Sequence, residues 1–444
     1  MTAADRQLLK MHRADQAFLL GLVLLPSSAL LGGLALLAAL LSPNGAKAGG
    51  WRHTPKVERA GWLVLVMLLL IGAIGARSGQ LAWVGLANWV PFIWAFWGFQ
   101  RFLNTGQQRR RAAIAIVSGT VPVLAIGLLQ LLLGWRGPWQ SLGGLFIWFL
   151  HDADPTVTPR FTGIFENPNL SGAWLVMVWP LALALLLGGN KPDQQAQTPA
   201  AKAITALLTG LIGLSLLLSG SRNAIGLALL AVPLVLGWRC LRWYAPLAIA
   251  WLGAVWLAAS SGAPPLLHQL SRLVVPATLW EKVARKVLDP QAAVTLAHRS
   301  REALWEGAGQ FLQQLPPLGY GENGFRLLYE AKTGTYINHS HNLPLEFVLS
   351  HGWLAAGLFL LLIAVVLAGA WRAGIAASSG LDRAWMAATL VTIGLHGWDI
   401  PSFDSRHNVL GWVLLAGVQA YRLTAQRDPA PPSPARPSEP SAPG

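Results

Sequence analysis

The chain has 444 residues, of which 54% are hydrophobic and only 12% are charged, and its formal net charge is +14. Soluble domains are about 25% charged, so this composition excludes an ordinary soluble protein. Most Lys and Arg residues stand in short clusters between long apolar segments, as in the cytoplasmic loops of membrane proteins, which argues against a nucleic-acid partner. The single cysteine, Cys240, excludes a framework of intramolecular disulfides.

Apolar segments long enough to form membrane-crossing helices, which need about 20 residues, follow one another along most of the chain. They cover 17–41, 61–76, 81–103, 112–133, 170–188, 203–219, 223–238, 243–260, 352–370, 384–397 and 407–423. We therefore predict an all-α, polytopic integral membrane protein with about 12 transmembrane helices (11–12) over residues 1–423. The Pro- and Ser-rich residues 424–444 are predicted to be a disordered cytoplasmic tail.

The first apolar segment is predicted to be a compact hairpin. Pro26-Ser27-Ser28 lies in its middle, and a bend there adds a twelfth crossing. An even number of crossings keeps the basic N-terminus on the same side as the C-terminus.

The distribution of basic residues sets the orientation. Only 134–169 and 261–351 are long connections. Placing 261–351 outside puts seventeen Lys and Arg residues on the inside, against five in the other outside connections. Within 261–351, Asp289-Pro290 predicts the start of a helix that ends at Leu315. Residues 266–275 mix apolar and basic side chains, as an interfacial helix does.

The polar chemistry gathers on the outer side, in four clusters at 160–169, 219–224, 299–305 and 339–346. Arginines that converge at a membrane surface suit a diphosphate, because guanidinium groups bind phosphate oxygens in pairs and stay charged. A nearby histidine can take a proton from a hydroxyl group. Taken singly, each arginine is more often an interfacial anchor, and each histidine an ordinary polar group of a loop. Asp152-x-Asp154 is more often a solvated acidic loop than a metal site, and no residue pattern requires a metal or cofactor.

In their order along the chain, these motifs resemble the O-antigen ligase/polymerase family. The resemblance extends over about residues 60–423 and rests on Arg160-x-x-Gly163-x-Phe165-x-Asn167-x-Asn169, Ser219-x-Ser221-Arg222-x-Ala224, Arg301-x-x-x-Trp305, Gly319-x-Gly321 and His341-Asn342-x-x-Leu345-Glu346 followed by Gly352. The N-terminal hairpin is shorter than the family pattern leads us to expect.

The resemblance implies a glycosyltransferase domain over 1–423, in the inner (plasma) membrane, with loop 261–351 and the active site facing the periplasm. Such enzymes of lipopolysaccharide and polysaccharide biosynthesis transfer a glycan from an undecaprenyl-diphosphate carrier to a glycan, lipid A–core or protein acceptor. It assigns catalytic roles to His341, Arg222 and Arg301, with no metal and no cofactor. Substrate-binding roles fall to Arg160, Asn167, Asn169, His339 and Arg299. Membrane lipids are the other expected partners.

A different class of function stays open at this point. The family also includes proteins linked to bicarbonate uptake, so a solute transporter or a component assisting inorganic-carbon uptake is the alternative. Such a protein needs polar residues at membrane depth, and the predicted spans hold almost none. The sequence does not distinguish a ligase from a polymerase.

Overall fold

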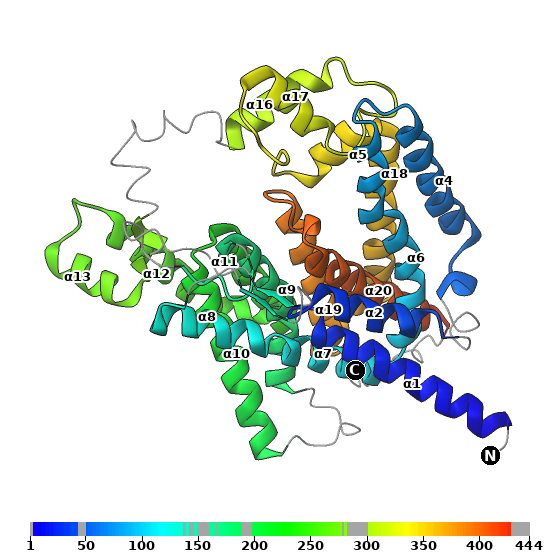
Figure 1. The fold of residues 1–444 in the computed structure, drawn as a ribbon. Coiled ribbons are helices and arrows are strands. Elements are labelled where there is room, and N and C mark those ends of the chain that lie inside the picture. Colours follow the sequence, from blue (N-terminus) through cyan, green and yellow to red (C-terminus); the bar gives the residue numbers. More distant parts are fainter. Residues whose placement is uncertain are drawn as a thin grey trace, which may run out of the picture.

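The computed structural model describes residues 3–42, 50–135, 139–141, 146–148, 160–165, 167–188, 198–277, 279–281 and 301–427 (Figure 1). Within these ranges the chain is almost entirely helical, which confirms the predicted all-α class. A single hairpin pairs β1 (Trp139–Ser141) antiparallel with β2 (Phe146–Trp148) in this part of the chain, and Trp139 lies opposite Trp148.

Seven helical segments of the described residues are long and apolar enough to cross a membrane. They are α4 (Lys56–Ile74), α5 to η3 (Gln80–Phe102), α7 and α8 (Gly106–Leu133), α9 (Pro168–Leu187), α10 (Pro199–Ser219), η5 and α12 (Trp238–Ala259) and α18 (Leu343–Arg372). The multi-pass membrane protein predicted from the sequence is thereby confirmed. The total of about twelve crossings stays a prediction.

The remaining helices are shorter or more polar than these seven. They are α1 (Ala3–Leu24), α2 (Ala29–Leu40), η1 (Gly50–His53), α11 (Arg222–Leu236), α13 (Pro265–Val274), α16 (Arg301–Leu312), α17 (Gly324–Thr333), η7 (Ile375–Ala377), α19 (Gly380–His396), η8 (Pro401–Phe403) and α20 (Ser405–Arg427). Inside the composite segments, α5 is Gln80–Gly85, η2 is Leu86–Asn88, α6 is Val90–Phe99, η3 is Gln100–Phe102, α7 is Gly106–Gly119, α8 is Val121–Leu133, η5 is Trp238–Cys240 and α12 is Leu241–Ala259. Helix α20 runs past the predicted start of the tail at 424, and residues 428–444 lie outside the described residues.

The N-terminal hairpin forms where the sequence predicts its bend. Helix α1 ends at Leu24, and Ser28 caps α2 by accepting a 3.2 Å hydrogen bond from the N–H of Leu31. Gly32 allows the two arms to meet, since a Cβ atom there would stand 2.6 Å from the Cα of Leu25. Helix α2 has 12 residues and is about 18 Å long. It is too short to cross a hydrocarbon core of about 30 Å.

Helix α9 is the centre of the bundle. Its residues are buried all around its axis, including Trp174, Leu175 and Met177, as expected of a helix that other helices surround. Helices α10, α11 and α19 pack against it. In contrast, α12 lies at the periphery, and its exposed side chains include Leu252 and Trp256.

Part of the loop predicted to lie outside, in α16, α17 and the first turns of α18, forms a small helical unit, the outer unit, at one end of the molecule (Figure 1). Leu304 and Ala308 of α16 are buried against Phe325 and Tyr329 of α17, and α16 ends at Leu312, close to the predicted end at Leu315. The predicted start at Asp289-Pro290 lies outside the described residues. Helix α18 is interrupted at Gly352, where φ is 79° and ψ is 169°, so its first turns belong to the outer unit.

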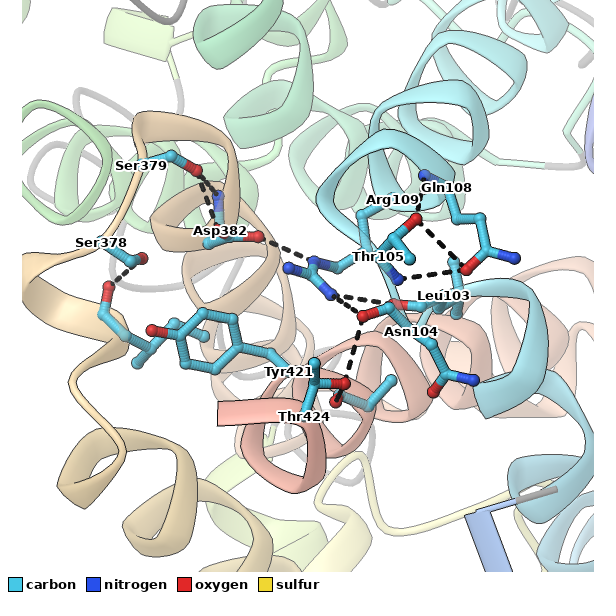
Figure 2. Close-up of polar contacts among 12 residues, drawn as sticks. Leu103, Asn104, Thr105, Gln108, Arg109, Ser378, Ser379, Asp382, Tyr421 and Thr424 are labelled. Carbon is cyan, nitrogen blue, oxygen red and sulfur yellow. Dashed lines mark hydrogen bonds and ion pairs between the residues drawn. The ribbon is translucent and has the colours of Figure 1, made fainter. Parts of the chain in front are cut away.

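At the opposite end of the bundle, buried polar contacts join the helices to one another (Figure 2). Arg109 of α7 donates to Asp382 of α19 at 2.7 Å and to the carbonyl oxygen of Leu103 at 2.9 Å. Nearby, Arg422 of α20 donates to Glu58 of α4 at 2.9 Å. Two of the seventeen basic residues assigned to the inside therefore form buried ion pairs between helices.

Candidate functional site

A polar cleft of about 860 Å³ opens at the end of the bundle that the sequence analysis predicts to lie outside. It is bordered by the N-terminal ends of α9, α11 and α16 and by the segment between α19 and η8. Four of the residues selected from the sequence line it: Arg160, Asn169, Arg222 and Arg301. The fold thus brings together three arginines from three distant segments, as the sequence analysis expected.

Arg160 is held in place by two hydrogen bonds. Its Nε donates to the carbonyl oxygen of Ser219 at 2.7 Å, and one terminal nitrogen donates to the Oδ1 of Asn169 at 3.2 Å. Burial, and secondarily the positive charge of Arg222, lower the pKa of Arg160 to about 10. The side chain therefore stays charged at neutral pH, and an anion bound beside it would relieve this repulsion.

Arg222 is the first residue of α11, and its side chain is exposed at the cleft. Among the described residues it has no ion pair or hydrogen bond to a side-chain partner. The first backbone N–H groups of α11 lie at the same place, and Ser221 makes no side-chain cap with them. A helix N-terminus with uncapped N–H groups favours an anion, so the dipole of α11 reinforces the positive charge.

Arg301 begins α16, and one of its terminal nitrogens lies 3.7 Å from the Oδ2 of Asp399. The other carboxylate oxygen, Oδ1, lies 2.9 Å from the Nδ1 of His341. Asp399 lines the cleft and therefore links a phosphate-binding candidate to the predicted base.

The Asp399–His341 contact fixes the tautomer of the imidazole. Burial alone would raise the pKa of Asp399, but the hydrogen bond and charge of His341 and the N–H of Ile400 lower it. An ionised carboxylate only accepts hydrogen bonds, so the Nδ1 of His341 carries the hydrogen. The Nε2 of a neutral His341 then holds a lone pair and can accept a proton.

The backbone at His341 is constrained. With a φ of 56°, His341 is one of two non-glycine residues with positive φ in the described chain. Asn342 holds this turn, because its Oδ1 caps α18 by accepting from the N–H of Leu345 at 2.9 Å, and its Nδ2 donates to the carbonyl oxygen of Gly397 at 3.0 Å. Left-handed backbone of this kind costs about 1–3 kcal/mol and gathers at functional sites.

Neither histidine is among the residues that line the cleft: His341 reaches it through its contact with Asp399, and His339 packs against His341. The Nδ1 of His339 accepts the backbone N–H of His341 at 3.3 Å, and the two ring centroids are 4.4 Å apart. Burial, the neighbouring His341 and Arg301 lower the pKa of His339 to about 4, although Asp399 opposes the shift. The contact gives neutral His339 a positioning role.

Two other selected residues are not seen at the cleft. Asn167 caps α9, and its Oδ1 accepts from the N–H groups of Asn169 and Leu170 at 2.8 and 3.0 Å. Arg299 lies outside the described residues. Asp399 is the functional candidate to which the sequence analysis gave no role. Its only signal was its place just after the predicted span 384–397.

One group of side chains at the site has the composition of a metal site. The ring nitrogens of His339 and His341 and the carboxylate of Asp399 lie within 4.8 Å of one another. In this arrangement the Nδ1 of His339 accepts a backbone N–H and that of His341 contacts Asp399. The Nδ1 atoms of both histidines and the carboxylate of Asp399 therefore already have partners within the protein.

Comparison with known families identifies the central part of the chain. Residues 206–362 match the family model described as O-antigen ligase. The matched range extends from α10 into α18 and contains Arg222, Arg301 and His341. Comparison with curated proteins gave no match. The resemblance to the O-antigen ligase/polymerase family, inferred from the motifs, is confirmed for this range.

Proposed function

We propose that this chain, whose residues 206–362 match the O-antigen ligase family, moves a glycan from an undecaprenyl-diphosphate carrier to an acceptor, on the periplasmic face of the inner membrane. The observation that carries this proposal is the shared cleft, where three arginines from separate segments lie beside a histidine–carboxylate pair.

The arginine cleft fits the diphosphate of the donor. Arg160 already donates a hydrogen bond to the carbonyl of Ser219. The side chain of Arg222 is exposed at the cleft, and Arg301 makes a long contact of 3.7 Å with Asp399. The guanidinium groups of Arg222 and Arg301 are therefore available to bind phosphate oxygens. As the bond between the sugar and the diphosphate breaks, they stabilise the charge that develops on the leaving group.

His341 fits the role of the base that activates the acceptor. Its Nε2 takes the proton of the acceptor hydroxyl while the oxygen bonds to the anomeric carbon. The electron pair of the broken bond leaves with the polyprenyl diphosphate. Attack from the face opposite the diphosphate inverts the anomeric carbon. Asp399 holds the Nδ1–H of His341 and stabilises the imidazolium that forms, so it is a positioning residue.

The test is transfer by the full chain in membrane vesicles supplied with a polyprenyl-diphosphate-linked oligosaccharide. We expect glycosylated acceptor to appear together with free polyprenyl diphosphate, and we expect EDTA to leave the rate unchanged. The Arg222→Lys variant should lose most of this activity. Arg239→Lys, an exposed arginine at the opposite side of the bundle, is the matched control. Donor consumption that persists in Arg222→Lys at the normal rate would overturn the proposal.

A deletion strain then distinguishes the two activities that the family covers. In a ligase mutant, gel analysis of the surface polysaccharide should show lipid A–core without long chains. In a polymerase mutant, the core should carry single repeat units. Normal polysaccharide together with impaired inorganic-carbon uptake would favour the transporter alternative.

A further inference from the structure

A second cavity, of about 120 Å³, lies between α18, α19 and α20. Its walls are mostly apolar, with Phe347, Phe359 and Ile363 of α18 facing Trp412 of α20. It is separate from the arginine cleft, but the segment that follows α19 contributes to both. Asp399 lines the cleft, and Ser402 lines the second cavity.

The second cavity opens toward the lipid side of the bundle. Leu360 of α18 and Ile393 of α19 both line it, and they are 47% and 40% exposed. Leu361, the next residue of α18, is 58% exposed and is not among the residues that line the cavity. A side-facing apolar opening between two predicted spans is accessible to a lipid chain without passage through water.

Three polar atoms of residues that line this cavity have no hydrogen bond within the described residues, and one of them, the Nδ1 of His407, lies 3.4 Å from the Oδ1 of Asp404. The other two are the Oγ of Ser402, a residue that is 6% exposed, and the Nε2 of His396. The Nδ1 of His396 lies 2.6 Å from the carbonyl oxygen of Thr392 and therefore carries the hydrogen. Nε2 can then only accept a hydrogen bond, and Ser402 can donate one. Because buried polar groups without partners are costly, the cavity suits a ligand that is apolar but carries a polar linkage.

We propose that this cavity binds an acyl chain of the acceptor, close to the amide or ester that attaches the chain to its sugar. The proposal rests on the proposed function, and it narrows the acceptor to a glycan carried on an acylated lipid. A polyprenyl chain fits less well, because it has no polar atom below its diphosphate and the diphosphate is assigned to the arginine cleft. An amide offers both an N–H for His396 and a carbonyl oxygen for Ser402.

The dimensions and the position agree with this occupant. An apolar cavity of about 150 Å³ holds a benzene molecule, so 120 Å³ accommodates a segment of roughly six carbons. Leu343 and Pro344 line the cavity and stand two and three residues after His341. A lipid held here would therefore present its sugar near His341.

Photolabelling of the full chain in lipid nanodiscs tests the assignment without requiring turnover. One probe is a glycolipid with an amide-linked acyl chain that carries a diazirine near the amide. The other is a polyprenyl diphosphate with a diazirine in its first isoprene unit. We expect the glycolipid probe to label cavity residues of α18 and α19, as mapped by peptide mass spectrometry. Ile363→Trp, which fills the cavity, should lower this labelling at least fivefold, whereas Leu361→Trp on the lipid-facing side should not.

Each outcome is decisive for the cavity. Thermal unfolding checks that the variants fold, and Thr392→Leu serves as a second filling variant if Ile363→Trp does not. Labelling by the polyprenyl probe in place of the glycolipid, or labelling that neither filling variant reduces, would overturn the proposal. If glycolipid labelling is specific but transfer is absent, the proposed function is wrong and the acyl-chain site stands. If transfer occurs without specific labelling, the acyl-chain site is wrong and the function stands.

Discussion

Asp399 contacts both parts of the candidate site, an arginine of the cleft and the histidine proposed as the base. One carboxylate oxygen faces Arg301 and the other contacts His341. The residue itself is fixed by a hydrogen bond from the N–H of Ile400 at 2.9 Å. A single carboxylate thus sets the tautomer of the base and lies beside an arginine that the donor would occupy. Binding of a diphosphate would draw Arg301 away from Asp399 and leave the carboxylate to His341 alone.

The proposed role of Arg222 and Arg301 depends on the geometry of the guanidinium group as well as on its charge. If these residues bind a diphosphate, replacing either by lysine removes the paired donors of the guanidinium group. We expect both lysine variants to be strongly impaired, and alanine variants to lose on the order of 2–4 kcal/mol of transition-state stabilisation. Single-turnover transfer, normalised to the amount of folded protein, measures this. Residues that only anchor helices at the interface would tolerate lysine, so full activity in both lysine variants contradicts the phosphate-binding role.

Within the histidine pair, His341 is predicted to be the base and His339 its support. His341→Ala should lower the transfer rate by about 10²–10⁴-fold while donor binding persists, because the arginines remain. His339→Gln should cost less, since its amide oxygen can still accept the N–H of His341. Asp399→Asn should impair transfer and change its pH profile, because the amide can impose the wrong tautomer. A loss of less than about tenfold in His341→Ala would exclude it as the base.

The lowered pKa of His339 predicts a dependence of stability on pH. Its pKa is about 4 in the folded chain, against an ordinary value of 6.5. The unfolded chain therefore binds more protons between these values, and stability must fall as the pH decreases from 6.5 to 4. We expect His339→Gln to reduce this fall in the melting temperature of the solubilised protein. An unchanged pH dependence in the variant would show that His339 is not buried as described.

At the scale of elements, helix termini place most of the site. Asn342 caps α18 and holds the turn of His341, Arg222 and Arg301 begin α11 and α16, and Asn167 caps α9 beside Arg160. The sequence predicts apolar segments well, because their length follows from the thickness of the bilayer. The sequence also predicted that Arg160, Arg222 and Arg301 lie on the same side of the protein, and all three line the cleft. It could not show that Asn167 faces its own helix, because an asparagine that caps a helix and one that binds a ligand look alike in sequence.

The cap role of Asn167 can be separated from substrate binding. Serine is also a good N-cap, so Asn167→Ser should keep near-normal stability and transfer, whereas Asn167→Ala should lose about 1 kcal/mol of stability. Asn169→Ser is the matched comparison, since it shortens the side chain that accepts from Arg160. Thermal unfolding and transfer are measured together on all three variants. A stable Asn167→Ser protein with transfer reduced more than tenfold would restore Asn167 as a substrate ligand.

For the whole molecule, the two ends of the bundle differ in what their arginines do. At the cleft Arg222 is exposed, whereas at the other end Arg109 and Arg422 are buried in ion pairs with Asp382 and Glu58. Asp382 and His396 lie near opposite ends of α19, fourteen residues apart, which corresponds to about 21 Å along the helix. The count of basic residues assigned Arg109 and Arg422 to one side, but could not show that these two bind other helices. Pairing across the bundle depends on contacts between distant segments.

The last prediction concerns the orientation of the whole molecule in the membrane. Both termini are expected in the cytoplasm and loop 261–351 in the periplasm, because basic residues collect on the inner side. Gln313, after α16, and Gln426, near the end of α20, are both exposed and suit single-cysteine replacement in a Cys240→Ala background. A membrane-impermeant maleimide should label Gln313→Cys in cells whose outer membrane alone is permeable, and Gln426→Cys only after the inner membrane is opened. Labelling of Gln426→Cys before that step would invert the topology. The arginine cleft would then face the cytoplasm, where nucleotide-linked rather than lipid-linked sugars would be the donors to test.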